Sequence, residues 1–89
     1  MTYGIKNFKR VDDRTIAFKH KQGKDHKFLP WMLIHDWANI NRLNKRYEGY
    51  GNVIVELPDG DYKYYKHEIQ PVSDNMEIAI IYLTKGEAT

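Results

Sequence analysis

The sequence contains no cysteine, a single serine and no long apolar run, and each of these shortages removes a class of function. Without cysteine there is no disulfide, no thiolate zinc site and no thiol nucleophile. The serine, Ser73, precedes Asp74 in a turn-like segment and does not stand in a nucleophile elbow. Apolar runs such as residues 31–34 are far too short to span a bilayer. No charged-then-apolar leader opens the sequence, so we expect a cytoplasmic protein without a membrane partner.

Two further motifs of small-molecule chemistry are missing. The segment Gly49-Tyr50-Gly51 has the glycines of a phosphate loop, but no lysine follows it and no helix is expected to begin after it. No pair of the four histidines shows the spacing of a closed metal site. We therefore expect no bound metal and no cofactor.

What the sequence does contain is the composition of one globular domain with an uneven distribution of charge. With 89 residues, of which 42% are hydrophobic and 29% charged, residues 1–89 fit a single compact domain. Residues 1–46 hold eleven Lys or Arg against four Asp or Glu, and residues 47–89 hold three against eight. The two halves carry +7 and −5, which suggests a basic face and an acidic counterpart.

Hydrophobic periodicity predicts strands at both ends of the chain and a helix between them. Residues 22–25 read as the tip of a hairpin, and residues 58–61 and 71–75 read as turns. We expect strands over residues 3–11, 14–21, 26–29, 53–57, 62–70 and 76–83. The expected fold class is α+β: a single antiparallel sheet with one amphipathic helix packed across it, in the order ββ(β)-α-βββ.

The expected helix covers residues 30–47, because Pro30 suits a first helical turn and Gly49 suits a cap after the last. Its apolar stripe consists of Met32, Leu33, Trp37, Ile40, Leu43 and Tyr47. We expect Trp37, Ile40 and Leu43 to be buried together with Ile78 and Ile80. Trp31 and Ile34 fall outside this stripe, so they read either as residues covered by a preceding segment or as a protein interface.

Basic side chains gather in two places that could hold phosphates or an acidic protein surface. The expected hairpin tip carries Lys19, Lys21, Lys24 and Lys27. On the helix, His35, Asn39, Arg42 and Arg46 follow helical spacing on the face opposite the apolar stripe. The structural alternative in both places is an ordinary solvated surface, and in the tip also protection of a sheet edge.

Tyrosine is abundant, at seven residues, and several tyrosines alternate with lysines in one expected strand. Tyr62 and Tyr64 should share a face with Lys66, an arrangement that can stack unpaired bases and hold phosphates. Tyrosine is also a good strand former and a common protein-interface residue, so this pattern has a structural interpretation too.

These observations favour a small non-enzymatic binding protein over an enzyme. The first hypothesis is an accessory or inhibitor protein of the phage or mobile-element type that binds a nucleic-acid-handling host protein or nucleoprotein. The second is direct binding of RNA or single-stranded DNA, and a homodimer is compatible with either. The third is a small metal-independent ribonuclease using His, Lys, Arg and Tyr, since toxin ribonucleases are similarly short and basic.

Overall fold

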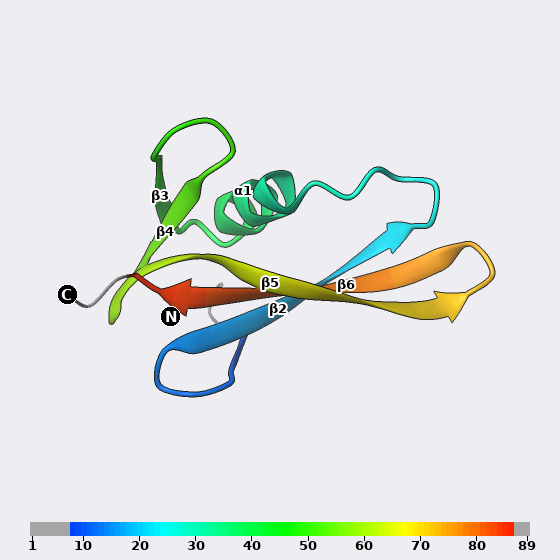
Figure 1. Ribbon diagram of the computed structural model, residues 1–89, viewed down its shortest axis with the longest axis horizontal. Helices are drawn as coiled ribbons and strands as arrows, with labels where there is room; N and C mark the ends of the chain where they lie inside the picture. The colour runs from blue at the N-terminus through cyan, green and yellow to red at the C-terminus, as the bar shows by residue number, and fades with distance from the viewer. Residues whose placement is uncertain (1–7, 87–89) are drawn as a thin grey trace.

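In a computed structural model, residues 8–86 form one six-stranded antiparallel sheet and one helix, and these are the residues that the structure describes. The strand order is β1-β2-β6-β5-β4-β3. Figure 1 shows β3 and β4 rising away from the three long strands, with the helix beside them. The elements are β1 (Phe8–Arg10), β2 (Thr15–Gly23), α1 (Pro30–Ile40), β3 (Asn44–Tyr47), β4 (Val53–Leu57), β5 (Gly60–Ser73) and β6 (Met76–Lys85). The α+β fold class is confirmed.

Helix α1 begins where the sequence predicts and ends seven residues earlier than expected, at Ile40 and not at residue 47. Pro30 occupies the first turn, where its missing N–H is no loss. Arg42 then adopts a left-handed φ of 57° and turns the chain. The Leu43 N–H donates to the Ala38 carbonyl at 2.8 Å, which closes the turn. The end of the predicted helix forms β3 instead: it pairs with β4 from Asn44 opposite Glu56 to Tyr47 opposite Val53, and Arg46 forms ion pairs with Glu56 and Asp61.

The buried face of α1 is rotated from the predicted one. Leu33, Ile34, Trp37 and Ala38 are buried, and the Trp37 ring stacks on Phe18 of β2 with centroids 4.4 Å apart. The prediction that Ile40 is buried was wrong, because its side chain is 73% exposed at the last position of the helix. Because the helix ends at Ile40, the second half of the predicted apolar stripe is no longer helical. The residues that face the sheet are instead spaced i, i+1, i+4 and i+5, beginning at Leu33.

Strand β2 is one residue longer than predicted, and it pairs with β6 and not with the expected return strand over residues 26–29. It pairs along its whole length with β6, from Thr15 opposite Thr84 to Gly23 opposite Met76. The expected return strand over residues 26–29 is absent: residues 24–29 form the connection to α1. This correction removes the lysine-rich hairpin tip. Of the expected first strand, β1 is described, while residues 3–7 lie outside the described residues.

The last three strands confirm the predicted meander. Leu57 pairs with Gly60, whose φ of 142° lets the chain reverse between β4 and β5. Strand β5 continues past the expected turn at Pro71 to Ser73, with irregularities in its pairing to β6 at Tyr65 and Val72.

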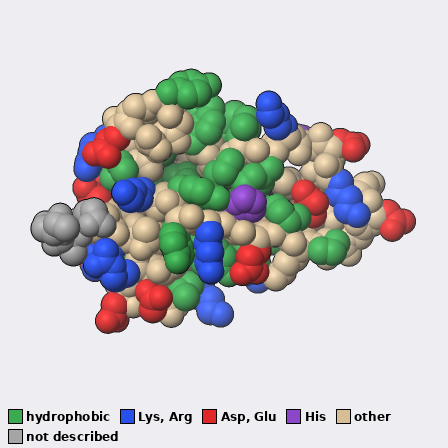
Figure 2. Space-filling view, viewed as in Figure 1, with side chains coloured by type: hydrophobic (Ala, Val, Ile, Leu, Met, Phe, Trp, Pro, Cys, Tyr) green, Lys and Arg blue, Asp and Glu red, His purple; other side chains and the backbone are tan. Residues whose placement is uncertain are grey.

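The sheet order mixes the two oppositely charged halves of the chain. Strands β1 and β2 lie at one edge and β3 at the other, all from the basic half, while β6, β5 and β4 lie between them. Figure 2 accordingly shows Lys and Arg interspersed with Asp and Glu over the visible face. The charge asymmetry of the sequence therefore does not become one basic and one acidic half of the molecule.

Candidate nucleic-acid interface

The two faces of the sheet differ in what covers them. Helix α1 packs against the face that carries Phe18, Ile81 and Leu83, and there the main core forms. Because side chains alternate along a strand, their neighbours point to the other side, which we call the open face. Lys19 and Lys21 of β2 lie on the open face, opposite Ile80 and Ile78 of β6 respectively.

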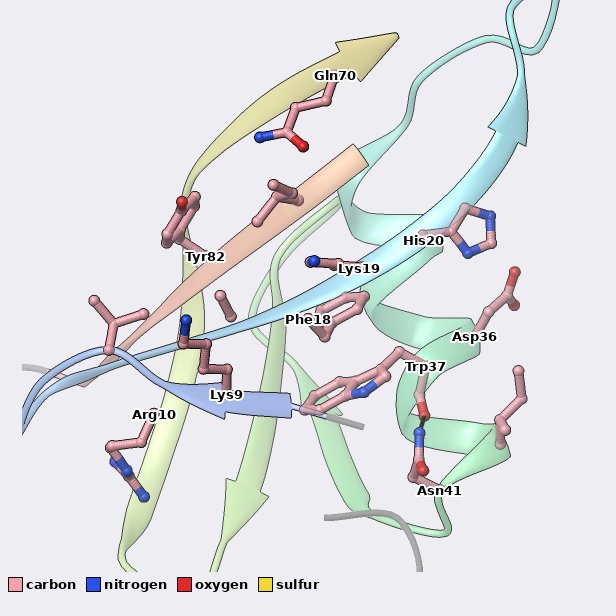
Figure 3. Close-up of a pocket in the computed structure, with 14 residues that line it drawn as sticks. Lys9, Arg10, Phe18, Lys19, His20, Asp36, Trp37, Asn41, Gln70 and Tyr82 are labelled. Carbon is pink, nitrogen blue, oxygen red and sulfur yellow. Dashed lines mark hydrogen bonds between the residues drawn. The ribbon is translucent and has the colours of Figure 1, made fainter. Parts of the chain in front are cut away.

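One row of the open face crosses four strands and places a tyrosine between lysines. The register sets Lys9 opposite Ala17, Ala17 opposite Tyr82, and Tyr82 opposite Lys66. Neighbouring strands are about 4.8 Å apart, so the row spans about 14 Å from β1 to β5. The small side chain of Ala17 leaves space beside the tyrosine ring. Figure 3 shows Lys9, Lys19 and Tyr82 on this side of the sheet and Phe18 and Trp37 on the other.

Lys66 sits between two aromatic rings at the β5 side of this row. Its Nζ lies 5.2 Å from the centroid of Tyr82 and 5.6 Å from that of Tyr65. Tyr65 is the extra residue of the β-bulge between Tyr64 and Lys66, which turns its 56% exposed side chain toward the same lysine. The result is an ammonium group between an exposed ring, that of Tyr65, and a partly exposed one, that of Tyr82.

The hydroxyl group of Tyr82 is held by a residue of β5, the strand that also carries Lys66. It donates a hydrogen bond to the Glu68 carboxylate at 3.0 Å. This hydrogen bond, with burial adding to it, raises the pKa of Tyr82 above its ordinary value. The phenol therefore stays protonated at neutral pH and holds the ring in place beside Lys66.

Two hollows share Val11 and Tyr82 in their linings, and we call the two together the track. The larger, about 1050 Å³, runs around the edge of β2: Lys9, Lys19 and Tyr82 line it on the open face, and Phe18, Trp37 and Ile40 line it on the helix side. The smaller, about 720 Å³, is lined by Tyr65, among other residues. Lysines therefore border this track on β1, β2 and β5, and tyrosines form part of its floor.

Tyr62 is not part of this surface, contrary to the sequence prediction. It is fully buried on the helix side, where its hydroxyl donates to Asp59 at 2.9 Å and accepts from Arg10 at 2.5 Å. Burial raises the pKa of Tyr62. Burial also acts to raise the pKa of Asp59, but the hydrogen bond from Tyr62 and the charges of Arg10 and Lys85 outweigh it and lower that pKa. This network joins β1 to the β4–β5 turn.

Tyr64 also lies on the helix side, because the bulge separates it from Lys66. Its hydroxyl group is 2.6 Å from Nδ1 of His67, and the Phe28 ring packs against His67 with centroids 4.3 Å apart. The sequence prediction that Tyr64 and Lys66 share a face is therefore wrong. The extra residue of the bulge exchanges the two faces for every residue that follows it, and the sequence pattern of an alternating strand does not reveal where a bulge lies.

The predicted stripe of His35, Asn39, Arg42 and Arg46 is not a continuous helix face, because the helix ends between its second and third members. His35 and Asn39 remain adjacent, with Nδ1 and Nδ2 3.4 Å apart, and Lys45 donates a hydrogen bond to Asn39. Arg46 lies on β3 and bonds the carboxylates of Glu56 and Asp61, each at 2.8 Å. These two hydrogen bonds raise its pKa.

The predicted protein interface at Trp31 and Ile34 is also corrected. Ile34 is 1% exposed and belongs to the core, and Trp31 is half-buried against that core. The covering segment also differs from the expected one. Trp31 lies near Tyr50, with ring centroids 6.2 Å apart, and near Gly51, both in the β3–β4 connection that follows α1 and not in a segment that precedes it. Lys24 and Lys27 are exposed, as expected, but they stand in the connection between β2 and α1 and not on the open face.

Sequence reasoning missed Lys9, Tyr65 and Tyr82 as members of the site. A signal for Tyr82 was present, because β6 is apolar on both faces, which marks a strand in the interior of a sheet. Its alternation already sets Tyr82 on one face with Ile78 and Ile80. Which strand lies beside it, and hence which lysines flank the ring, depends on the sheet order.

Within residues 8–86, no group of three or more His, Asp or Glu side chains is placed to hold a metal ion. At 11 residues, the helix in that part of the chain is too short to cross a membrane. No protein-family model matches the chain, and comparisons with curated proteins and with solved structures also give no match.

Proposed function

We propose that this protein binds single-stranded nucleic acid, RNA or DNA, on the open face of its sheet and without catalysis, in the cytoplasm. The observation that carries the proposal is the row Lys9–Ala17–Tyr82–Lys66, in which a partly exposed tyrosine lies between lysines on the sheet face opposite α1.

The arrangement matches the two requirements for holding an unpaired strand. Aromatic rings stack on bases, which is worth about 1–3 kcal/mol per base, and Tyr65 and Tyr82 supply such rings. Lysines bordering the track neutralise phosphates and release counterions. A duplex hides the faces of its bases, so the aromatic contribution favours single strands.

The same side chains predict a weak preference for sequence. Lysine is a flexible point charge, and ring stacking accepts every base. Arg46, which could read a base edge with two hydrogen bonds, already binds Glu56 and Asp61. We therefore expect similar affinities for oligonucleotides of different sequence and equal length.

The experiment is fluorescence anisotropy with labelled single-stranded and duplex oligonucleotides at fixed salt. Tyr65→Ala should weaken single-strand binding about tenfold, which corresponds to the loss of one stacked base. Tyr50→Ala is the matched control, because Tyr50 is 95% exposed on the β3–β4 connection, away from the track. Equal affinity for duplex and single strand, or an equal loss in both variants, would contradict the proposal.

A protein target is the second candidate, favoured by the exposed apolar side chains of Ile40 and Val11, which line the larger hollow together with Lys9. In that case the chain acts as an accessory or inhibitor protein, of the phage or mobile-element type, on a nucleic-acid-handling protein. An acidic protein surface would then meet the lysines, and Ile40 would enter the interface. Oligonucleotide binding at background level, together with salt-sensitive capture of a protein that is lost in Ile40→Lys, would favour this candidate.

A further inference from the structure

Strand β5 has a long edge that the rest of the described chain leaves unpaired. Strand β4 pairs only with Gly60–Lys63 at its start. From Tyr64 to Ser73, the described part of the chain provides β6 as the strand partner on one side of β5 and none on the other. Figure 1 shows β4 leaving β5 at this point, while β5 runs on beside β6.

An exposed edge of this length presents backbone N–H and C=O groups that can pair with another strand. The bulges at Tyr65 and Val72 bracket a regular stretch, Lys66–Pro71, in which each residue has one partner on β6. In this stretch Ile69 is 41% exposed, so the edge also offers an apolar side chain. The edge is therefore suited to accept one further strand over a few residues.

A second copy of β5 can fill this edge with complementary charges in one register. Two identical antiparallel strands related by a two-fold axis always place one residue opposite its own copy. If that residue is His67, Lys66 lies opposite Glu68 of the partner subunit, and the symmetry repeats the pair. If it is Glu68, two carboxylates face each other; if it is Ile69, Lys66 loses its acidic partner.

Both members of the pair lie on the same face of the sheet, as a cross-strand contact requires. Lys66 pairs with Tyr82 and Glu68 with Ile80 of β6, and these positions belong to the open face. Opposite charges directly across two strands stabilise the pairing, and like charges destabilise it.

We propose that the protein forms a homodimer through the β5 edge, with antiparallel pairing centred on His67. The two sheets then become one continuous sheet, and the open faces of the two copies adjoin where Lys66 of one copy lies opposite Glu68 of the other. The inference stands independently of the proposed function, because it concerns the edge of the sheet and not a ligand.

The test is sedimentation equilibrium of the full chain without nucleic acid, over about 1 μM to about 1 mM, which covers the Kd range of weak interfaces. The wild type should show a monomer–dimer equilibrium. Lys66→Glu should weaken dimerisation at least about tenfold, because it creates like-charge contacts at both symmetry-related positions. Lys66→Glu combined with Glu68→Lys exchanges the charges of the pair and should restore dimerisation to within about threefold of wild type.

Lys63→Glu is the matched control, because Lys63 lies on β5 with the same orientation but is already paired with Ile54 of β4. It should leave the dimer unchanged. Circular dichroism confirms that each variant is folded before it is compared. A wild-type protein that stays monomeric throughout, or a double reversal no better than the single one, would overturn the proposal, whatever the result for nucleic-acid binding.

Discussion

Two isoleucines on α1 provide a direct test of how the helix packs. Ile34 is 1% exposed and Ile40 is 73% exposed, although the two lie only six positions apart. Replacing a buried isoleucine by alanine typically costs about 2–5 kcal/mol, through lost transfer free energy and a residual cavity. The whole domain should have about 4–13 kcal/mol of stability, on a scale of about 0.05–0.15 kcal/mol per residue. Ile34→Ala therefore removes a large fraction of it.

Ile40→Ala should change the free energy of unfolding by less than about 0.5 kcal/mol, since the side chain is mostly in water. Urea unfolding followed by circular dichroism measures both variants, and Ile34→Ala should also lower the Tm by at least about 8 °C. If Ile34→Ala does not fold, Ile34→Val provides the comparison, with an expected cost of about 0.5–1.5 kcal/mol. An Ile40→Ala cost equal to that of the Ile34 variant would refute the observed rotation of the helix.

Three further predictions concern other parts of the molecule. Against the effect of burial, a hydrogen bond and neighbouring cations lower the pKa of Asp59, so its contribution to stability is present above about pH 4 and is lost as pH falls through the lower folded-state pKa. Asp59→Asn should reduce the loss of unfolding free energy between neutral and acidic pH, measured by urea unfolding at a series of pH values. An unchanged pH dependence would contradict this role of Asp59. Gly60→Ala should cost about 1 kcal/mol or more in urea unfolding because of its φ of 142°, whereas Gly86→Ala, with its Cβ at ordinary contact distance, should cost less. Labelled RNA should remain intact with the purified protein on a denaturing gel, and cleavage that His67→Ala abolishes would revive the ribonuclease hypothesis.

The sequence predicts the strands of the last third well, because alternation and turn residues act locally there. Pro58, Asp59 and Gly60 mark a turn by their own backbone preferences. The helix shows the limit of such reasoning. Its periodicity continues to Tyr47, but the segment after Arg42 gains more from pairing with β4 than from further helical turns. Competition between a local pattern and a tertiary partner cannot be read from the pattern alone.

The candidate site shows the same division. Charge predicted Lys19, Lys21 and Lys66 as binding residues, and the structure places all three on the open face. The prediction grouped Lys66 with Tyr62 and Tyr64, which lie on the helix side because the bulge at Tyr65 inverts the faces. The order β2-β6-β5 instead brings Tyr82 between Lys66 and the lysines of β2. Register and strand order are non-local properties, so they became visible only in the folded chain.

The salt dependence of single-strand binding tests the central claim most directly. If Lys9, Lys19, Lys21 and Lys66 each neutralise a phosphate, the slope of log affinity against log salt should be about −3, at about 0.7 per contact. Lys19→Glu with Lys21→Glu should flatten that slope by about 1.4 and weaken binding at least about tenfold. Lys24→Glu with Lys27→Glu changes the net charge equally in the connection before α1, and it should leave the slope nearly unchanged. A flat salt dependence in the wild type, or equal effects of the two double reversals, would contradict binding on the open face.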